Sequence, residues 1–339
     1  MLYEAILPSL DVNPPIVICG PTASGKTALG LRVAERLPTP AEIISVDSRQ
    51  IYRRLDIGTA KPDANERGRV RHHLIGVIDP DETFSAARFA RFARQVTARL
   101  QSAGVTPIYV GGSGLYFSAL LDGIFADEEG HDGRRQPLLD RIESEGVAAL
   151  HAELAEVDPL SAQRISVNDE VRIVRALEVA LDGGSGRIRR WESDPGEILP
   201  GPTPVQVCLA MERQALYTRI DDRVHQMIAS GWVQEVESLR CQGLDTQAPG
   251  LNSLGYAEVI AALNGSISMV DAVDSIQRRT RQLAKRQITW FRRDRRLRTL
   301  RVDRLTADQA AQRIVAEWSS RATGFDLVEE GAVRVDRGV

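Results

Sequence analysis

The sequence predicts an α/β fold, in which a parallel β-sheet is flanked by helices and a small all-helical domain is inserted into the chain. Three observations lead to this prediction. Short apolar runs alternate with stretches of helical hydrophobic spacing, a glycine-rich motif lies between the first run and the first helix, and a long middle stretch has helical spacing without any strand-like run. Strands that alternate with helices need crossover connections, which make the sheet parallel.

The first half of the chain contains three predicted strands and two predicted helices. We expect strands at Ile16–Cys19, Glu42–Val46 and Thr106–Val110, because each is a short apolar run that ends at a glycine or an aspartate. We expect helices at Ala28–Leu37 and Ser85–Ala103, where apolar residues recur at spacings of three and four.

The second half divides into a helical stretch and a return to the core. Residues 126–204 show only helical spacing, and Pro204–Met211 is expected to be a returning strand. Long helices are expected at Arg213–Gln242 and Val270–Arg293. The predicted domains are the first part of the core at 15–125, the helical insert at 126–204, the core continuation with basic C-terminal helices at 205–323, and a disordered tail at 324–339.

The composition is typical of a globular protein. The chain has 339 residues, 43% of them hydrophobic, and no apolar run approaches the length of a membrane span. The first 15 residues lack the basic start and cleavage pattern of a signal peptide, so we expect a cytoplasmic protein without membrane contact. The three cysteines, Cys19, Cys208 and Cys241, have no disulfide or zinc spacing and are expected to pack as small apolar side chains.

Charge is distributed unevenly along the chain. Between Arg278 and Arg301 lie eleven Lys or Arg and one acid, Asp294, so this segment has a charge of +10. Because the whole chain has a net charge of −3, the remainder has a charge of −13. A strongly basic segment on an acidic protein indicates a polyanionic partner, although a solvated charged face is the simpler alternative.

The glycine-rich motif is a P-loop. The pattern GxxxxGK[ST] follows a predicted strand and precedes a predicted helix, which is the structural context of a phosphate-binding loop and favours a P-loop NTPase-like sheet. Backbone N–H groups and the helix N-terminus can bind phosphate, the lysine supplies a positive charge, and the threonine can ligate Mg²⁺. The expected phosphate-binding residues are Gly20, Pro21, Thr22, Ala23, Ser24, Gly25, Lys26 and Thr27, with Thr27 as the metal ligand.

The motif alone does not indicate ATP hydrolysis. An ordinary P-loop ATPase has an acidic residue at the end of a neighbouring strand, which completes its magnesium site. Here the Thr106–Val110 strand is followed by Gly111-Gly112-Ser113-Gly114, and the strand-terminal acid near the loop is Asp47. Asp47 could therefore have a different role.

Further motifs accompany the P-loop in a fixed order. They are Val46-Asp47-Ser48-Arg49-Gln50-Ile51-Tyr52, Asp56-Ile57-Gly58-Thr59-Ala60-Lys61-Pro62, His72-His73-Leu74-Ile75, Val110–Tyr116, Arg172–Glu178 and Ala284–Phe291. In this order they resemble the tRNA dimethylallyltransferase family, the bacterial tRNA isopentenyltransferases. The resemblance runs from about Pro15 to Asp303, and although the P-loop is generic, the combination of the other motifs is specific to this family.

The resemblance implies a function. The family transfers a dimethylallyl group from dimethylallyl diphosphate to N6 of the adenosine on the 3′ side of the anticodon and releases diphosphate. We therefore expect a Mg²⁺-dependent enzyme whose partners are dimethylallyl diphosphate and the anticodon stem-loop of tRNA, and we expect it to act as a monomer. The adenosine must leave the stacked loop to reach the site, at a cost of a few kcal/mol.

The resemblance also implies roles for individual residues. Asp47 would be the base that removes the proton from N6, Thr27 would hold Mg²⁺, and Arg213 would contact the diphosphate. Gln50 follows one short turn after Asp47, and its amide could read an adenine edge with a donor and an acceptor. Simpler interpretations exist for three of these residues: Asp47 could cap the following turn, Gln50 could be a solvated polar residue, and Arg213 could be a surface arginine. The implied tRNA-binding residues are Asp47, Ser48, Arg49, Gln50, Ser113, Val171, Arg172, Ile173, Val174, Arg175, Arg278, Arg281 and Lys285.

The sequence departs from the family pattern in several places. Arg49 replaces a small or apolar residue and Arg54 replaces a glycine, which adds positive charge near the expected pocket. Ser166–Glu170 stands where the family commonly has His-Pro-Asn-Asp-Pro, and Ser253 lies where the family's glutamine before Gly-Tyr is expected. The loop at Glu128–Gln136 and the sequence Gly183-Gly184-Ser185-Gly186 are also unusual. Together with Ser166–Glu170 they lie in the helical insert, where they concern RNA contacts rather than the transfer chemistry.

Three other functions remain open on the sequence alone. A small-molecule kinase would need an acid that is missing here, and an isopentenyltransferase acting on free adenine nucleotides would leave the basic segment without a purpose. An RNA-binding ATP switch would leave RNA covalently unchanged. Assays with ATP and with dimethylallyl diphosphate, and mass spectrometry of incubated tRNA, distinguish these functions.

Overall fold

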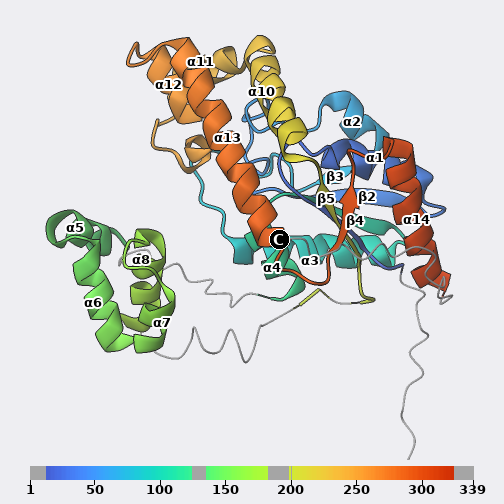
Figure 1. Cartoon of the computed structure of the whole chain (residues 1–339), viewed down its shortest axis with the longest axis horizontal. Helices are drawn as coiled ribbons and strands as arrows, with labels where there is room; N and C mark the ends of the chain where they lie inside the picture. The colour runs from blue at the N-terminus through green and yellow to red at the C-terminus, as the bar shows by residue number, and fades with distance from the viewer. Residues whose placement is uncertain (1–12, 124–134, 182–197, 200, 324–339) are drawn as a thin grey trace, which may run out of the picture. The chain divides into compact units, whose positions relative to one another are not determined.

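The computed structural model describes residues 13–123, 135–181, 198–199 and 201–323 (Figure 1). The chain divides into two compact units. The sheet unit comprises Met1–Phe84, Phe92–Phe117 and Pro200–Val339, and the helical unit comprises Ser85–Arg91 and Ser118–Leu199. The predicted tail at 324–339 lies outside the described residues.

The sheet unit is built on a six-stranded sheet in the order β3-β2-β4-β1-β5-β6, and every pair of neighbours is parallel. This confirms the predicted fold class. The strands are β1 Ile16–Cys19, β2 Ala41–Val46, β3 His72–His73, β4 Thr106–Gly111, β5 Val205–Ala210 and β6 Arg298–Arg301. Because the strands are parallel, the residues that follow β1, β2, β4 and β5 meet at one edge of the sheet, where ligands of open α/β sheets bind.

Helices connect these strands. In chain order they are α1 Lys26–Arg36, α2 Ala64–Arg69, α3 Ala86–Ser102, α4 Gly114–Leu121, α10 Arg213–Ala229, α11 Trp232–Cys241, the 3₁₀ helix η2 Pro249–Asn252, α12 Tyr256–Leu263, α13 Met269–Phe291 and α14 Ala307–Thr323. The predictions at Ala28–Leu37, Ser85–Ala103 and Val270–Arg293 agree with α1, α3 and α13 to within about two residues.

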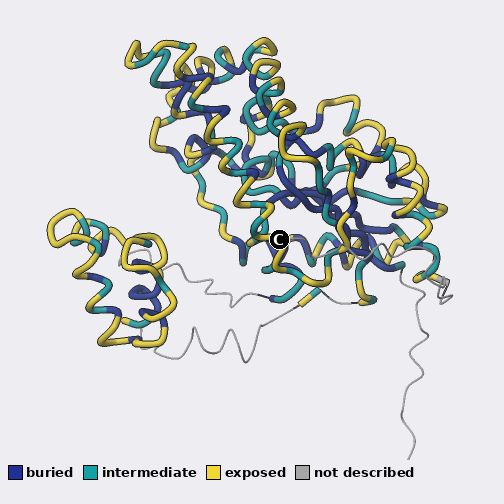
Figure 2. The backbone as a smooth tube through the Cα atoms, viewed as in Figure 1, coloured by how far each residue is buried: buried dark blue, intermediate teal, exposed yellow. Residues whose placement is uncertain are grey.

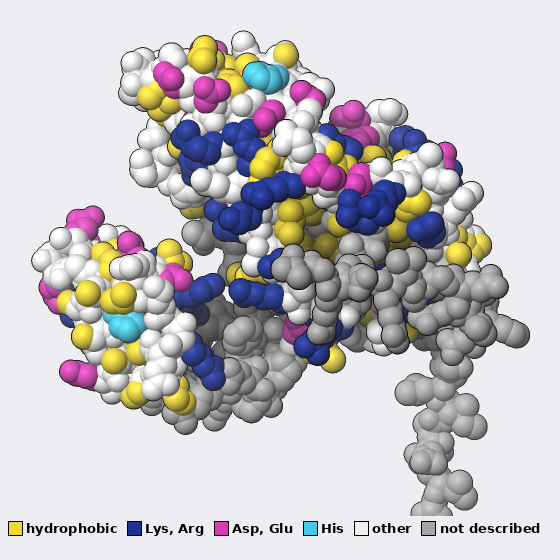
Figure 3. Space-filling view, viewed as in Figure 1, with side chains coloured by type: hydrophobic (Ala, Val, Ile, Leu, Met, Phe, Trp, Pro, Cys, Tyr) yellow, Lys and Arg dark blue, Asp and Glu magenta, His cyan; other side chains and the backbone are white. Residues whose placement is uncertain are grey.

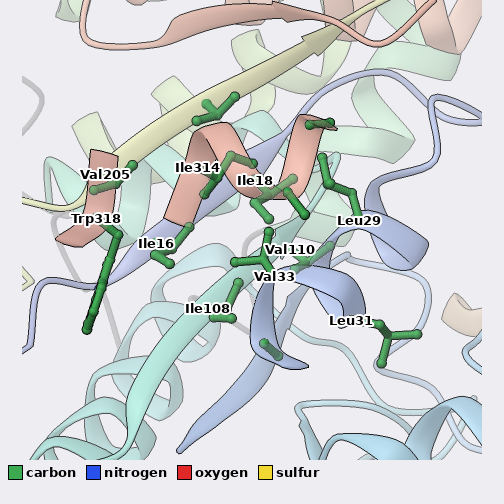
Figure 4. Packing of buried hydrophobic residues seen from close by; sticks show 14 of the residues in the cluster. Ile16, Ile18, Leu29, Leu31, Val33, Ile108, Val110, Val205, Ile314 and Trp318 are labelled. Carbon is green, nitrogen blue, oxygen red and sulfur yellow. The ribbon is translucent and has the colours of Figure 1, made fainter. Parts of the chain in front are cut away.

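Both faces of the central strands are buried, as Figure 2 shows for the middle of the sheet. Figure 4 shows one face, where Ile16, Ile18, Ile108 and other strand residues pack with α1 and with Ile314 and Trp318 of α14. On the opposite face the Tyr109 hydroxyl is hydrogen-bonded to Thr97 of α3. Burial on both sides explains why these strands are continuous apolar runs rather than alternating ones.

The two edge strands, β3 and β6, were not predicted. β3 has only two residues, and β6 is the sequence Arg-Thr-Leu-Arg, in which Leu300 alone is buried. Short and charged strands are typical of sheet edges, where they discourage pairing with other chains, and they carry little hydrophobic signal.

The prediction of one helix over Arg213–Gln242 was wrong. The structure has two helices, because α10 ends at Ala229 and Gly231, with a φ of 100°, begins α11 at Trp232. That left-handed conformation suits glycine. The break lets Trp232 enter the core between two glycines, since a Cβ on either Gly58 or Gly255 would lie only 2.1 Å from its indole.

The helical unit contains α5 Arg135–Glu145, α6 Val147–Val157, α7 Pro159–Arg164 and α8 Glu170–Val179. These helices have a core of their own, formed by Leu138, Leu150, Leu154, Ala162, Ile173, Val174, Ala176 and Leu177. No strand occurs within the described part of this unit. The exact domain boundaries remain a prediction.

No helix in the described part of the chain combines the length and the apolar character that spanning a bilayer requires.

Candidate active site

The phosphate loop joins β1 to α1 and has an unusual backbone. Gly20, Ala23 and Gly25 have φ values of 145°, 62° and 90°. Gly20 cannot be replaced easily, because a Cβ there would lie 2.9 Å from the carbonyl oxygen of Leu209. These positive φ values let the loop curl back at the start of α1, where the N–H groups of the helix N-terminus are suited to an anion.

Lys26 is folded into this loop. Its Nζ donates a hydrogen bond of 2.6 Å to the carbonyl oxygen of Pro21. Burial, together with the positive charge of Arg223, lowers the pKa of Lys26 to about 8, while the charge of Asp47 acts in the opposite direction. An anion in the loop would stabilise the charged form of the lysine, because opposite charges at short range favour ionisation.

Two arginines of α10 lie beside the loop, and the sequence analysis did not single them out. A Cβ on Gly25 would lie 3.5 Å from Arg219 Nη2. Burial lowers the pKa of Arg223, and the charge of Asp47 acts in the opposite direction. No hydrogen bond or ion pair holds Arg223 among the residues that the structure describes. A half-buried guanidinium at the wall of a cavity is suited to an anionic ligand. The sequence does contain a feature that could have indicated them: Arg219 and Arg223 are four residues apart, which places them on the same face of the helix that follows the returning strand.

Arg213 occupies a different place from the one expected. It is the first residue of α10, it is exposed, and its Nε donates to the Tyr217 hydroxyl at 3.2 Å. Its guanidinium also lies over the Tyr217 ring, 5.4 Å from the centroid. The structure therefore gives Arg213 the contacts of a surface arginine, and Arg223 rather than Arg213 shares electrostatic interactions with Lys26 and Asp47.

Asp47 follows β2 at the same edge of the sheet. Its Oδ1 accepts hydrogen bonds from the backbone N–H of Arg49 at 2.8 Å and of Gln50 at 3.4 Å. Asp47 therefore does cap the turn, as one interpretation of the sequence predicted, but only its Oδ1 takes part. The other oxygen can still accept a proton, and the turn fixes the orientation of the carboxylate.

Two serines connect the ends of β2 and β4. Ser113 Oγ accepts from the Ser48 N–H at 3.0 Å, and the Ser113 N–H donates to the Val46 carbonyl at 3.2 Å. Glycine is required next to them, because a Cβ on Gly111 would lie 2.0 Å from the Val46 carbonyl oxygen. The Val110–Gly114 segment thus brings Ser48 and Ser113 together, beside Asp47.

The Gln50 amide is hydrogen-bonded within the protein. Gln50 Nε2 donates to the carbonyl oxygens of Thr59 at 3.3 Å and Ala60 at 3.0 Å, and its Oε1 accepts from Ser45 Oγ at 3.0 Å. These bonds give Gln50 a structural role, and its contact with a base stays a prediction. Arg49 is also engaged, since Nη1 donates to the Pro249 carbonyl at 3.3 Å.

Helix α13 packs directly on the loop and on the glycines after β4. Ala284 is fully buried in a cluster with Ala23, and Gln287 Oε1 accepts from the Thr22 N–H at 2.8 Å. Gln287 Nε2 donates to the Gly112 carbonyl at 3.0 Å. A Cβ on Gly114 would lie 2.4 Å from Trp290. The glycines in this segment therefore allow close approach of α13.

The basic residues of α13 differ in their partners. Arg278 and Lys285 are exposed, and Arg278 donates a hydrogen bond to Ser275 of its own helix. Arg281 forms an ion pair of 2.5 Å with Asp221, and Arg279 forms one with Glu258. Figure 3 shows Lys and Arg side chains gathered where α13 runs in Figure 1. Of the three predicted tRNA-binding residues on α13, Arg278 and Lys285 are the more accessible, while Arg281 helps to hold α10.

In the helical unit the predicted segment Val171–Arg175 is split between surface and core. Ile173 and Val174 are fully buried in the unit's core, so the prediction that these two side chains contact RNA is wrong. Val171 is 64% exposed. Arg172 pairs with Asp169 at 3.2 Å and Arg175 with Glu178 at 3.1 Å, and both side chains remain partly accessible.

The Asp56–Pro62 segment is held by one carboxylate. Glu235 of α11 accepts from the backbone N–H groups of Asp56 and Ile57 at 2.7 Å and of Gly58 at 3.3 Å, and from the Tyr256 hydroxyl at 2.6 Å. A cavity of about 430 Å³ lies between this segment, α2 and α10, and Arg223 is part of its wall.

The residues of the loop fit a magnesium ion held with a diphosphate. Ser24 Oγ is buried without a hydrogen-bond partner, and Thr27 lies at the start of α1. No cluster of three or more His, Cys, Asp or Glu residues occurs in the described ranges. Mg²⁺ commonly binds through one or two protein oxygens together with substrate phosphates and water, so a dedicated acidic cage is not needed.

Comparison with known proteins identifies the family. Residues 50–294 match the family model described as IPP transferase, which is more than half of the chain. The chain belongs to this family. The phosphate loop precedes the matched range, but longer alignments with individual proteins cover most of the chain.

Two curated relatives carry the name tRNA dimethylallyltransferase. The one from Geobacter metallireducens is 44% identical over 284 residues, which cover 82% of this chain and 89% of the relative. The enzyme named tRNA dimethylallyltransferase 1 from Syntrophotalea carbinolica is 45% identical over 285 residues, with 83% and 89% covered.

Solved structures show the same fold. The tRNA isopentenylpyrophosphate transferase of Bacillus halodurans is 35% identical, with a TM-score of 0.67, over 92% of this chain and 97% of that one. A eukaryotic dimethylallyltransferase described as acting on tRNA is 25% identical, with a TM-score of 0.76, over 93% and 81%.

Proposed function

We propose that this chain transfers a dimethylallyl group from dimethylallyl diphosphate to N6 of the adenosine on the 3′ side of the anticodon in tRNA. The names of its relatives support a prenyl transfer to tRNA. The observation that carries the proposal is the arrangement of the site. A loop suited to a diphosphate and a strand-end carboxylate, Asp47, share one edge of the sheet, and Lys26 and Arg223 interact electrostatically with Asp47.

The reaction joins a carbon to a weakly basic nitrogen. The N6 lone pair forms the new C–N bond as the bond between C1 of the isoprenoid and the diphosphate oxygen breaks. The electron pair of that C–O bond leaves with the diphosphate, and the N6 proton passes to the free oxygen of Asp47. General base catalysis of this kind typically contributes 10²–10⁴-fold to the rate.

The loop stabilises the charge that develops on the leaving group. The N–H groups of the loop, Lys26 and Arg223 bind the diphosphate, and Arg219 lies close enough to assist. Thr27 would hold Mg²⁺, which supplies further positive charge to the departing oxygens. Donors fixed in advance around a developing charge are among the largest contributors to catalysis.

Accessible basic residues are suited to the RNA. Arg278 and Lys285 on α13, and Arg172 and Arg175 on α8, would contact phosphates of the anticodon stem-loop. Such contacts fix the position of the RNA and contribute the free energy needed to extrude the adenosine. Ser48 and Ser113 line the place where the extruded base would meet the isoprenoid.

The proposal includes Mg²⁺ as cofactor, a monomeric enzyme and action in the cytoplasm, where tRNA is found. Removal of Mg²⁺ with a chelator should abolish transfer, and addition of Mg²⁺ should restore it.

The experiment that tests the function is an incubation of the protein with Mg²⁺, an anticodon stem-loop RNA and either dimethylallyl diphosphate or ATP. The expected product is RNA that carries one dimethylallyl group on the adenosine beside the anticodon, identified by mass spectrometry of its nucleosides. ATP should give no modified RNA. Consumption of ATP with unchanged RNA, and no transfer from dimethylallyl diphosphate, would favour the RNA-binding switch instead.

A further inference from the structure

The side-chain amide of Gln287 connects two segments that lie far apart in the sequence. Its Oε1 accepts from the N–H of Thr22 in the phosphate loop at 2.8 Å, and its Nε2 donates to the carbonyl of Gly112 after β4 at 3.0 Å. Both ends of the amide are therefore used, and each partner is a backbone group. Replacement by a side chain that lacks either function would leave one of these groups without its partner.

The connection continues from Gly112 to Asp47. Gly112 is followed by Ser113, whose Oγ accepts from the Ser48 N–H at 3.0 Å, and Ser48 follows Asp47. A continuous path of covalent and hydrogen bonds thus runs from the phosphate loop through Gln287 to the carboxylate. The leaving-group site and the proton acceptor are joined by this path.

Packing fixes Gln287 in its place. One turn earlier, Ala284 is fully buried against the cluster that contains Ala23, and one turn later Phe291 packs edge-to-face with Phe117, with centroids 6.0 Å apart. A Cβ on Gly112 would lie only 2.4 Å from Gln287 Nε2, so the strand-end backbone approaches the amide as closely as glycine allows. A side chain anchored on both sides can define a distance between the segments that it joins.

We infer that Gln287 is a positioning residue for the transfer, which sets the distance between the diphosphate in the loop and the adenine beside Asp47. The inference rests on the proposed function. Reacting atoms must lie about 3–3.5 Å apart and in line, and a displacement of about 1 Å can cost roughly 100-fold in rate. Gln287 would therefore affect the rate of transfer more than the binding of either substrate.

The test is the Gln287→Met variant, which nearly preserves volume and removes both hydrogen bonds. We expect kcat to fall by about 10- to 100-fold. The KM for dimethylallyl diphosphate and the affinity for inorganic diphosphate should change by less than roughly threefold, because the loop keeps its own donors. Gln287→Leu is a second variant, and thermal unfolding shows whether both are folded. Gln282→Met, at an exposed position of the same helix, is the matched control.

Three results would overturn the inference. A folded Gln287→Met or Gln287→Leu enzyme with the parental kcat would show that the two bonds do not set the geometry. A loss of diphosphate affinity as large as the loss of kcat would show that Gln287 only maintains the loop. A parent enzyme that does not transfer would overturn the proposed function and this inference together, whereas an active parent beside an unimpaired variant overturns this inference alone.

Discussion

Asp47 illustrates how one side chain can serve both fold and chemistry. Its Oδ1 holds the turn after β2 through the N–H groups of Arg49 and Gln50. Asp47 also lies at the carboxyl edge of the sheet, where its charge interacts with Lys26 and Arg223. In the proposed reaction its second oxygen accepts the proton of the substrate. The two interpretations offered by the sequence, a turn cap and a base, are therefore compatible.

Lys26 makes diphosphate binding dependent on pH. Burial lowers its pKa from 10.5 to about 8 in the free protein, so the ammonium loses its proton as the pH rises through 8. A bound anion needs the charged form. The affinity for the diphosphate should be highest below pH 8, where Lys26 is protonated, and should fall above pH 8 by at most about tenfold per pH unit. Calorimetric titration with a non-reactive analogue of dimethylallyl diphosphate between pH 7 and 10 measures this.

The Lys26→Arg variant is the control for this dependence. A guanidinium keeps its charge throughout the range, so the step above pH 8 should disappear even if the affinity is lower. A parent protein whose affinity stays constant up to pH 10 would contradict the assignment.

Glu235 should be important for stability although it lies outside the proposed chemistry. It accepts three backbone N–H groups of the Asp56–Gly58 turn and the Tyr256 hydroxyl, and its charge contributes to raising the pKa of Tyr256, after the effect of burial. Glu235→Ala should lower the free energy of unfolding by roughly 1.5–3 kcal/mol, the range for hydrogen bonds to charged groups. Denaturant unfolding checks this, with Glu237→Ala, an exposed glutamate of the same helix, as control. Equal stabilities of the two variants would be inconsistent with the proposed role of Glu235.

At the scale of elements, α13 has two different sides. Ala284 and Gln287 contact the phosphate loop and the segment after β4, and Phe291 packs on Phe117 of α4. Arg278 and Lys285 are exposed. Ile288 of the same helix is 41% exposed, so not every apolar residue of α13 faces the core. The helix can therefore bind RNA on the outside while it holds the site on the inside.

This division predicts a specific effect on RNA binding. Arg278→Ala combined with Lys285→Ala should weaken binding of the anticodon stem-loop. The slope of log affinity against log salt should fall by about one for each phosphate that the variant no longer neutralises. The affinity for diphosphate should not change. Filter binding at several salt concentrations measures the slope, and Arg240→Ala, at an exposed position of α11, is the control. If the slope did not change, Arg278 and Lys285 would not contact RNA phosphates.

The elements that the sequence predicted well are those with strong local signals. β1, β2, β4 and β5 are buried apolar runs, and the P-loop is recognised from its own residues. Arg223 carried no comparable signal, and Gln287 was part of the Ala284–Phe291 motif but was given no role, because the importance of both comes from contacts across the fold. Thr22 and Gln287 are 265 residues apart. The hydrogen bonds of Gln50 could not be predicted for the same reason, since its partners include the carbonyl groups of a different loop.

At the scale of the whole molecule, the described residues of the proposed chemistry lie in the sheet unit, while the helical unit has a separate core. The proposed transfer chemistry therefore uses residues of the sheet unit alone. The departures at Ser166–Glu170 belong to the helical unit.

The central claim is that Asp47 takes the proton of the adenine amine while the loop holds the diphosphate. Asp47→Asn tests it most directly, because asparagine keeps the Oδ1 that caps the turn and removes the base. Single-turnover transfer to the anticodon stem-loop should fall by at least about 100-fold, whereas diphosphate affinity should stay the same or increase slightly, as a negative charge near the loop is removed. An Asp47→Asn enzyme that transfers at the parental rate would contradict the account.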